Sequence, residues 1–469
     1  MRIHGYIYPR LLFLQNWGYD VKHTQFGGRA ITLTFAFALA TWSGSALSLS
    51  LEEALIQSLK NSNKIASSRD SWIAARESVF SSSATKESSL KYSGSGSLSE
   101  TDSGSGYTGS NSYSNKITFS KNIFDGGQSR ENLKLAEIQL ERATASFRNA
   151  EQGVVLETVQ SYLNLSKSYQ EIELKRNNVL RLEKHVAAAK VNLAEGMATP
   201  TSLADAEARY ARAKADTAVF ATSLENAKDL FFKLTRMQAD NDLGEAHLFG
   251  VEKILPKSRQ LAEELALKNS PTVMIAKLAE KAASQELQSA RAQQNPTLGF
   301  NLSATQSNSS DSISASISVS SPLYSTNSTV SGARKKVALH SQSMTDLKEA
   351  IGNVKIEARS AFRDYEGSKI TLSAVEAEVE ASRLVVDGVA NELKFGLKTM
   401  LDLLDAEKGF NDAELRLVQA RHDIILKEFK LVAAIGGLTA SKLGIGQVLD
   451  KLSDSPRPEN PLRSPLSFW

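Results

Sequence analysis

Two segments of this chain, 200 residues apart, carry the same turn motif. Residues 195–207 read EGMATPTSLADAE and residues 395–407 read FGLKTMLDLLDAE; each has a glycine, a threonine three positions later, and a final Asp-Ala-Glu. Glycine is the residue that most readily adopts the left-handed conformation that ends a helix, and threonine can cap the helix that follows. The motif therefore predicts a sharp helix reversal at Gly196 and Thr199 and a second at Gly396 and Thr399, in a tandemly duplicated chain.

Apolar residues spaced seven apart flank both motifs. Before the motifs the matched positions are Leu165, Ile172, Val179, Val186 and Leu193, and Tyr365, Leu372, Val379, Val386 and Leu393. After them they are Leu203, Tyr210, Thr217, Leu224 and Phe231, and Leu403, Phe410, Leu417, Ile424 and Leu431. A stripe kept over four or more heptads specifies left-handed coiled-coil packing. The helix before Gly196 would run for about 65 residues, roughly 100 Å, which no compact domain needs.

Two segments rich in Ser, Gly, Thr and Asn lie between the predicted helical segments. In the second, Leu298, Phe300 and Leu302 alternate with polar residues, and apolar residues alternate again from Ile313 to Val319 after a polar turn. This pattern predicts a β-hairpin with one apolar face at about 296–323. The first segment, at about 89–123, alternates less clearly, and a hairpin is assigned there by analogy with the second. A flexible Gly/Ser linker is the alternative.

The N-terminal region has the layout of an export signal. The apolar run AITLTFAFALATW follows Arg29 and ends in small residues up to Ala46, which predicts a signal peptide over residues 1–46 rather than a membrane anchor. No later stretch offers about 18 consecutive apolar residues, so the remaining chain would enter a membrane only through its strands. There is no cysteine, which excludes disulfides, thiolate metal sites and lipid attachment through an N-terminal cysteine.

Composition and motifs argue against several function classes. Hydrophobic residues make up 41% and charged residues 23%, with a formal net charge of +3, which suits neither a disordered chain nor a nucleic-acid-binding protein. The six histidines lack metal-ligand spacing, and the FDGG segment lacks the lysine of a phosphate-binding loop. We therefore expect no enzyme, no cofactor and no bound metal.

The chain is divided as follows. Each half is expected to run helix, β-hairpin, very long helix, turn, helix. The signal is followed by a first repeat, a linker, a second repeat and a C-terminal tail, at residues 47–240, 241–256, 257–437 and 438–469.

One chain supplies only four strands, which is too few to close a barrel. Closed membrane barrels begin at about eight strands, and lipid does not tolerate open strand edges. Other copies of the chain must then complete the sheet. We expect a mainly α fold in which long coiled-coil helices form an α-barrel that continues from a small membrane β-barrel.

At this point the chain resembles the TolC family of outer-membrane efflux proteins. The resemblance rests on LSLEEALIQSLKNSNKI, on the helix openings IFDGGQSRENLKLAE and PLYSTNSTVSGARKK, and on the two turn motifs. It implies a homotrimer with a 12-stranded barrel in the outer membrane of a Gram-negative bacterium and a helical barrel in the periplasm. It also implies export of substrates from an inner-membrane transporter and a periplasmic adaptor, in drug efflux or type I secretion, with no nucleic acid as partner.

The resemblance also assigns site residues. It implies that Asp402 and Asp405, three apart on one helical face, close a periplasmic aperture together with Lys398. The alternative is that acidic residues simply favour a helix N-terminus. The turns at Gly196, Thr199, Gly396 and Thr399 would dock the adaptor. Two positions depart from some family members, which carry an acid at Ser202 and a tyrosine at Leu393; the resemblance therefore implies that the family's closing contacts are reduced here.

Two other functions compete with the channel. A secreted coiled-coil adhesin or structural fibre would explain the signal and the heptads, but not hairpins at matching places in both halves. A periplasmic adaptor usually has a single long helical hairpin with separate β-domains. The sequence does not distinguish drug efflux from protein secretion.

Overall fold

The computed structural model of the chain describes residues 50–84, 87–102, 104, 106–239, 254–321 and 327–444. The signal predicted at residues 1–46 lies outside these ranges, as does most of the predicted linker. All of the arrangement described below lies within the unit that begins at Leu47.

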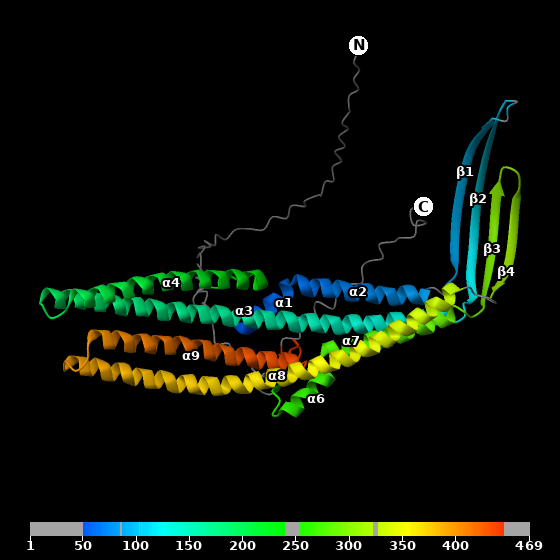
Figure 1. Cartoon of the computed structure of the whole chain (residues 1–469). Coiled ribbons are helices and arrows are strands. Elements are labelled where there is room, and N and C mark those ends of the chain that lie inside the picture. The colour runs from blue at the N-terminus through cyan, green and yellow to red at the C-terminus, as the bar shows by residue number, and fades with distance from the viewer. Residues whose placement is uncertain are drawn as a thin grey trace, which may run out of the picture. The chain divides into compact units, whose positions relative to one another are not determined.

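The two halves contain the same elements in the same order. The first half consists of α1 (Leu51–Asn61), α2 (Asn63–Ala84), β1 (Ser89–Asp102), β2 (Tyr107–Phe124), α3 (Gln128–Ala194) and α4 (Pro200–Thr235). The second consists of α6 (Arg259–Asn269), α7 (Pro271–Ala292), β3 (Thr297–Ser307), β4 (Asp311–Ser320), α8 (Asn327–Lys394) and α9 (Met400–Ala434). Figure 1 shows the long helices lying side by side, with the sheet at one end and both long-helix turns at the other. The predicted class, mainly α with a small sheet, is confirmed.

The segment before each hairpin differs from the prediction of a single helix, because it is broken in both halves. Ser62 is extended (φ −72°, ψ 117°) between α1 and α2, and its Oγ accepts a hydrogen bond from the Ile65 amide at 3.4 Å. Ser270 is extended in the same way between α6 and α7. There Pro271 follows at the first position of α7, and a proline disfavours the helical conformation in the residue before it.

The main core lies where both halves meet, midway along the helices. Its fully buried side chains come from α1, α3, α4 and α9, with Leu55, Tyr162, Phe231 and Val432 among the most enclosed. The rings of Tyr162 and Phe231 pack at a centroid distance of 6.3 Å. The heptad positions Leu165, Ile172, Leu224 and Phe231 all contribute to this cluster.

The start of the predicted C-terminal tail belongs to this core. Gly436 is left-handed (φ 69°) and lies so close to the backbone of Asn269 that a Cβ there would be 2.4 Å from the carbonyl oxygen. The turn directs Leu438, Ala440 and Leu443 into the core cluster. The Ala440 amide donates a hydrogen bond to the buried Glu151 carboxylate, and burial raises the pKa of that carboxyl. Residues 438–444 of the predicted C-terminal tail therefore pack against the core.

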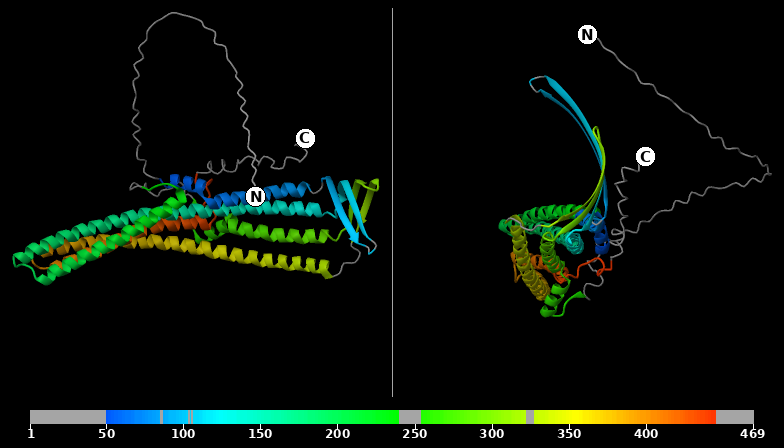
Figure 2. Two further views of the ribbon diagram at one scale, coloured as in Figure 1. Left: turned by 90° about the horizontal axis from the view of Figure 1, so that it is seen from above. Right: turned by 90° about the vertical axis from the view of Figure 1, so that its right-hand side faces the viewer.

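The four strands form one antiparallel sheet in the order β1-β2-β3-β4. The two hairpins are joined by pairing of β2 with β3, in which Ile117 lies opposite Ala304 and Phe119 opposite Leu302. Figure 2 shows the sheet beyond the ends of α2, α3, α7 and α8. Within the described residues, β1 and β4 each have a strand partner on one side only. None of the described helices has a stretch both long and apolar enough to cross a bilayer.

We expect Phe231→Ala to lower the free energy of unfolding by about 3–5 kcal/mol, because it empties a fully buried site. Denaturant unfolding of the detergent-solubilised protein, followed by circular dichroism, measures the change. The control is Phe231→Leu, which keeps most of the volume and should cost about 1.5 kcal/mol or less. Equal losses in the two variants would contradict this assignment of the core.

Candidate functional site at the helical tips

The two turns that join the long helices have the same backbone geometry. Gly196 and Gly396 are both left-handed, with φ of 76° and 71°. After α3, the Gly196 amide bonds to the Leu193 carbonyl at 3.0 Å and the Met197 amide to the Asn192 carbonyl at 2.8 Å. After α8, Gly396 and Leu397 repeat this pattern. This pair of hydrogen bonds is the Schellman motif, which satisfies the last carbonyls of a helix and requires a left-handed residue.

Both following helices are capped by the predicted threonines. Thr199 Oγ1 accepts a hydrogen bond from the Ser202 amide at 3.3 Å, and Pro200 occupies the first turn of α4. Thr399 takes part in a full capping box, because its Oγ1 accepts from the Asp402 amide while Asp402 Oδ2 accepts from the Thr399 amide at 2.8 Å. The first repeat has Ser202 where the second has Asp402, so it lacks the reciprocal carboxylate.

Asp402 thus has a role at the start of α9. Hydrogen bonds from the Thr399 side chain and backbone, with a smaller contribution from the charge of Lys398, hold the pKa of the Asp402 carboxyl below its ordinary value. A depressed pKa means that the contribution to stability is present at neutral pH and is lost as pH falls through the folded-state pKa. The helix-start role offered as the alternative for Asp402 is therefore present, while Lys398 is exposed beside it.

Asp405 is held by an arginine from the other repeat. Arg209 on α4 contacts Asp405 on α9 at 2.8 Å and Asp205, one turn before it on α4, at 2.9 Å. We call these three residues the tip clasp. Asp205 and Asp405 are the equivalent aspartates of the two motifs, so the clasp joins both copies of the motif through one guanidinium group.

The glutamates of the two motifs contact α3. Glu207 lies 3.2 Å from the ammonium group of Lys190. Glu407 lies with both carboxylate oxygens 3.0 Å from Nε2 of His185. The glutamate that ends each motif therefore links the helix after the turn, α4 or α9, to α3. This contact gives the repeated sequence a structural role.

Further from the tip, the contacts between α3 and α9 remain largely polar. Asn411 accepts a hydrogen bond from Arg181 and donates one to Asn178 at 2.7 Å, and Gln419 donates to Glu171 at 3.1 Å. His422 lies 3.2 Å from the Ser166 hydroxyl, and burial lowers the pKa of this histidine. One small apolar cluster, which includes Leu182, Val186, Ala206 and Leu404, interrupts the polar series.

The turns themselves expose large apolar side chains. Phe395 is 81% exposed, Leu397 75% and Met197 69%, and Leu401 in the first turn of α9 is about half exposed. Apolar groups gathered at one end of a structure mark an interaction surface more often than an inert one. We call these four residues the apolar tip.

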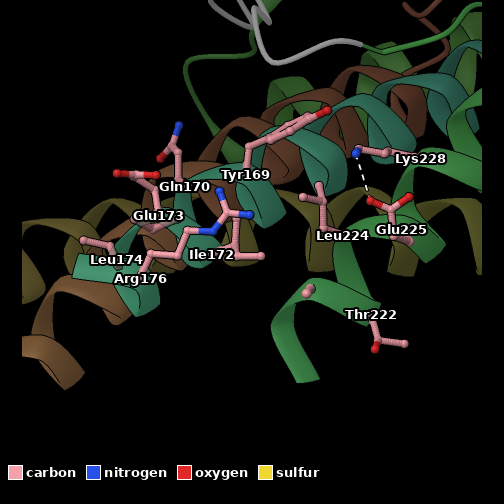
Figure 3. A pocket seen from close by; sticks show the side chains of 12 residues that line it. Tyr169, Gln170, Ile172, Glu173, Leu174, Arg176, Thr222, Leu224, Glu225 and Lys228 are labelled. Carbon is pink, nitrogen blue, oxygen red and sulfur yellow. Dashed lines mark hydrogen bonds and ion pairs between the residues drawn. The ribbon is translucent and has the colours of Figure 1, made fainter. Parts of the chain in front are cut away.

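An open groove between α3 and α4 carries charged side chains (Figure 3), and two of them pair with each other. Lys228 forms an ion pair with Glu225 at 2.9 Å and lies 5.6 Å from the centre of the Tyr169 ring. Across the described ranges, no cluster of three or more His, Asp or Glu side chains could hold a metal ion.

Duplicated hairpins of long helices, joined to a shared four-stranded sheet, define the class of outer-membrane export channels. The profile of the outer membrane efflux protein family matches residues 54–230 and 263–437, and the chain belongs to this family. It is an exit channel for efflux or type I secretion, with the strands in the outer membrane and the helices in the periplasm.

Individual relatives agree with this assignment. The outer membrane efflux protein BepC of Brucella suis biovar 1 is 28% identical over 338 residues, covering 70% of this chain and 73% of BepC. The outer membrane protein TolC of Vibrio cholerae is 22% identical over 336 residues, covering 69% and 76%. The structure of the Campylobacter jejuni CmeC outer membrane channel superposes with a TM-score of 0.73 at 13% identity, covering 86% and 89%, which shows a shared fold.

The structure thus brings all the predicted site residues to one end of the helices, but it adds partners that the sequence analysis missed. Arg209 and His185 were not among the predicted residues. The spacing of Asp205 and Arg209 at i and i+4 could have indicated a helical ion pair. Nothing in the sequence indicated that Arg209 would also reach Asp405.

Proposed function

We propose that three copies of the chain assemble into the exit channel, with a closed 12-stranded barrel and a continuous helical tube. The observation that carries this proposal is the pair of open edges at β1 and β4 in the described sheet. Backbone groups at such edges have no water to bond with inside a bilayer, so another strand must supply their partners. Pairing of β4 from one copy with β1 of the next meets that need around a ring.

The helices support the same assembly. Several large apolar side chains on α8 remain exposed in a single chain, in two groups whose members lie seven or fourteen residues apart. They are Val330, Val337 and Met344, and further along Ile370 and Leu384. Seven-residue spacing is the signature of a coiled-coil seam, and a neighbouring copy would cover these side chains. Such a tube carries substrates across the periplasm after an inner-membrane transporter and a periplasmic adaptor have delivered them.

The assembly is tested by extracting outer membranes with mild detergent and measuring the mass of the intact complex. We expect three copies of the mature chain, and discrete conductance steps when the complex is placed in a planar bilayer. A monomer in the soluble periplasmic fraction would contradict the proposal. A secreted fibre without channel activity would favour the adhesin alternative instead.

The proposed aperture lies at the helical tips, where three copies would place Asp402, Asp405 and Lys398 around the mouth. Carboxylate rings in a narrow pore attract cations and bind multivalent ones. Arg209 partly neutralises the charge of Asp405, so Asp402 contributes the larger share of the negative potential at the mouth. Widening of the mouth by movement of α9 away from α4 would break the tip clasp.

We expect the double variant Asp402→Asn, Asp405→Asn to weaken block by a trivalent cation added from the helical side by about ten-fold or more. Single-channel current at two salt concentrations measures the block, which should also weaken at high salt because screening is stronger. The control is Asp412→Asn, which removes a carboxylate paired with Lys408 further along α9. Unchanged block in the double variant would place the constriction elsewhere.

The adaptor is proposed to dock on the two turns around Gly196, Thr199, Gly396 and Thr399. The apolar tip supplies the contact surface, since Met197, Phe395 and Leu397 protrude from these turns. The occupant is the end of an adaptor's helical hairpin with apolar side chains of its own. Binding of the adaptor hairpin would remove the side chains of Met197, Phe395 and Leu397 from contact with water.

We expect Gly396→Trp to reduce export without reducing the amount of trimer, because its side chain would project into open space at the docking surface. Gly396→Ala is the matched control, since it has the same unfavourable left-handed backbone without the bulk. Export by a strain that depends on this channel measures the effect. Equal export by the two variants would exclude the turn as a docking point.

A further inference from the structure

The register of the sheet sorts its side chains into two faces of opposite character. Residues directly opposite each other in antiparallel strands share a face, so the pairings from β1 to β4 define each face across all four strands. One face, called the apolar face below, carries the large apolar side chains Leu90, Tyr92, Ile117, Phe119, Phe300, Leu302, Ile313, Ile317 and Val319, together with a few charged and amide side chains. A membrane barrel turns its apolar face to lipid, so the other face lines the conduit if the proposed trimer forms.

The conduit face consists almost entirely of small uncharged polar residues. On the outer strands it carries Ser89, Lys91, Ser93, Ser95, Ser97 and Ser99 of β1, and Ser312, Ser314, Ser316, Ser318 and Ser320 of β4. On the inner strands it carries Ser110, Ser112, Ser114, Lys116, Thr118 and Ser120 of β2, and Gly299, Asn301, Ser303, Thr305 and Ser307 of β3. Hydroxyl groups pair across the strands, as Ser97 does with Ser112 at 2.7 Å.

Acidic side chains are absent from this face of the paired strands. Glu100, Asp102 and Asp311 lie in the strands, but their register places all three on the opposite face. Lys91 and Lys116 are the only charged side chains among the residues just named. The conduit face therefore has a purely positive charge.

The two lysines are neighbours. Lys91 lies opposite Thr118 and Lys116 opposite Ser93, which makes the lysines a diagonal pair on one face, with Cα atoms roughly 7–8 Å apart. Both side chains are exposed. Three copies would place six ammonium groups at one height in the conduit, surrounded by hydroxyl groups that can also donate hydrogen bonds to an anion.

We propose that Lys91 and Lys116 form an anion-binding ring inside the strand region of the channel. The ring recognises phosphate, carboxylate or sulfate groups on solutes that pass, so the exit half of the conduit favours anionic substrates. This inference rests on the proposed trimeric channel. It makes the two ends of the conduit opposite in charge, with carboxylates at the helical tips and ammonium groups among the strands.

The test uses the full-length trimer in a planar bilayer and inorganic tripolyphosphate as the probe, added to each side in turn. We expect a reversible block of the current that weakens at high salt. The double variant Lys91→Gln, Lys116→Gln should bind the probe about ten-fold or more weakly. The control is Lys121→Gln, because Lys121 lies on β2 opposite Phe300 and so belongs to the apolar face; block in this variant should match the wild type.

The outcomes separate this inference from the function on which it rests. If the purified protein gives no channel, the proposed function fails and the ring fails with it. If channels form but tripolyphosphate does not block them, or blocks the double lysine variant as well as the wild type, only the anion-binding ring is overturned. Equal loss of block in Lys121→Gln would also overturn it, because the effect would then reflect total charge rather than the conduit face.

Discussion

Backbone hydrogen bonding in the four-stranded sheet is the constraint on which the rest of the architecture depends. A sheet with open edges at β1 and β4 is unsuited to a bilayer, where an unpaired amide or carbonyl costs several kcal/mol. In the proposed trimer the remedy is a closed ring of strands, which would place the long helices that follow the strands in a ring as well. Each helix of such a tube needs neighbours on both sides, and these neighbours would cover the apolar side chains that α8 exposes in a single chain.

Duplication gives two copies of each element, and the copies have diverged where they meet. Both turns use the same left-handed glycine and the same threonine cap, because the backbone problem is identical. The side chains around them are not equivalent. The second repeat completes a capping box through Asp402, whereas the first contributes Arg209, which binds the aspartates of both motifs.

The packing between the halves changes along the helices. Midway, Tyr162, Phe231 and their neighbours form a dense apolar core, to which residues after Gly436 also contribute. Toward the tips, ion pairs and amide hydrogen bonds replace most of this packing. These polar contacts bury less apolar surface than the core does, so hydrophobic burial contributes less to stability at the tips. The proposed opening of the channel at the helical tips would use this distribution.

The sequence by itself determined the features that depend on nearby residues: the glycine turns, the threonine caps, the heptad stripes and the alternating strands of the second hairpin. It also determined the duplication, which made the weaker first hairpin recognisable. Tertiary structure alone decided the contacts between distant residues, such as Arg209 with Asp405 and His185 with Glu407. It likewise placed Leu438 in the core, whereas the break before the second hairpin at Ser270 has a local cause in Pro271. Local patterns specify backbone conformation, but a side chain's partner across 200 residues depends on how two separately formed helices pack, and no local pattern encodes that.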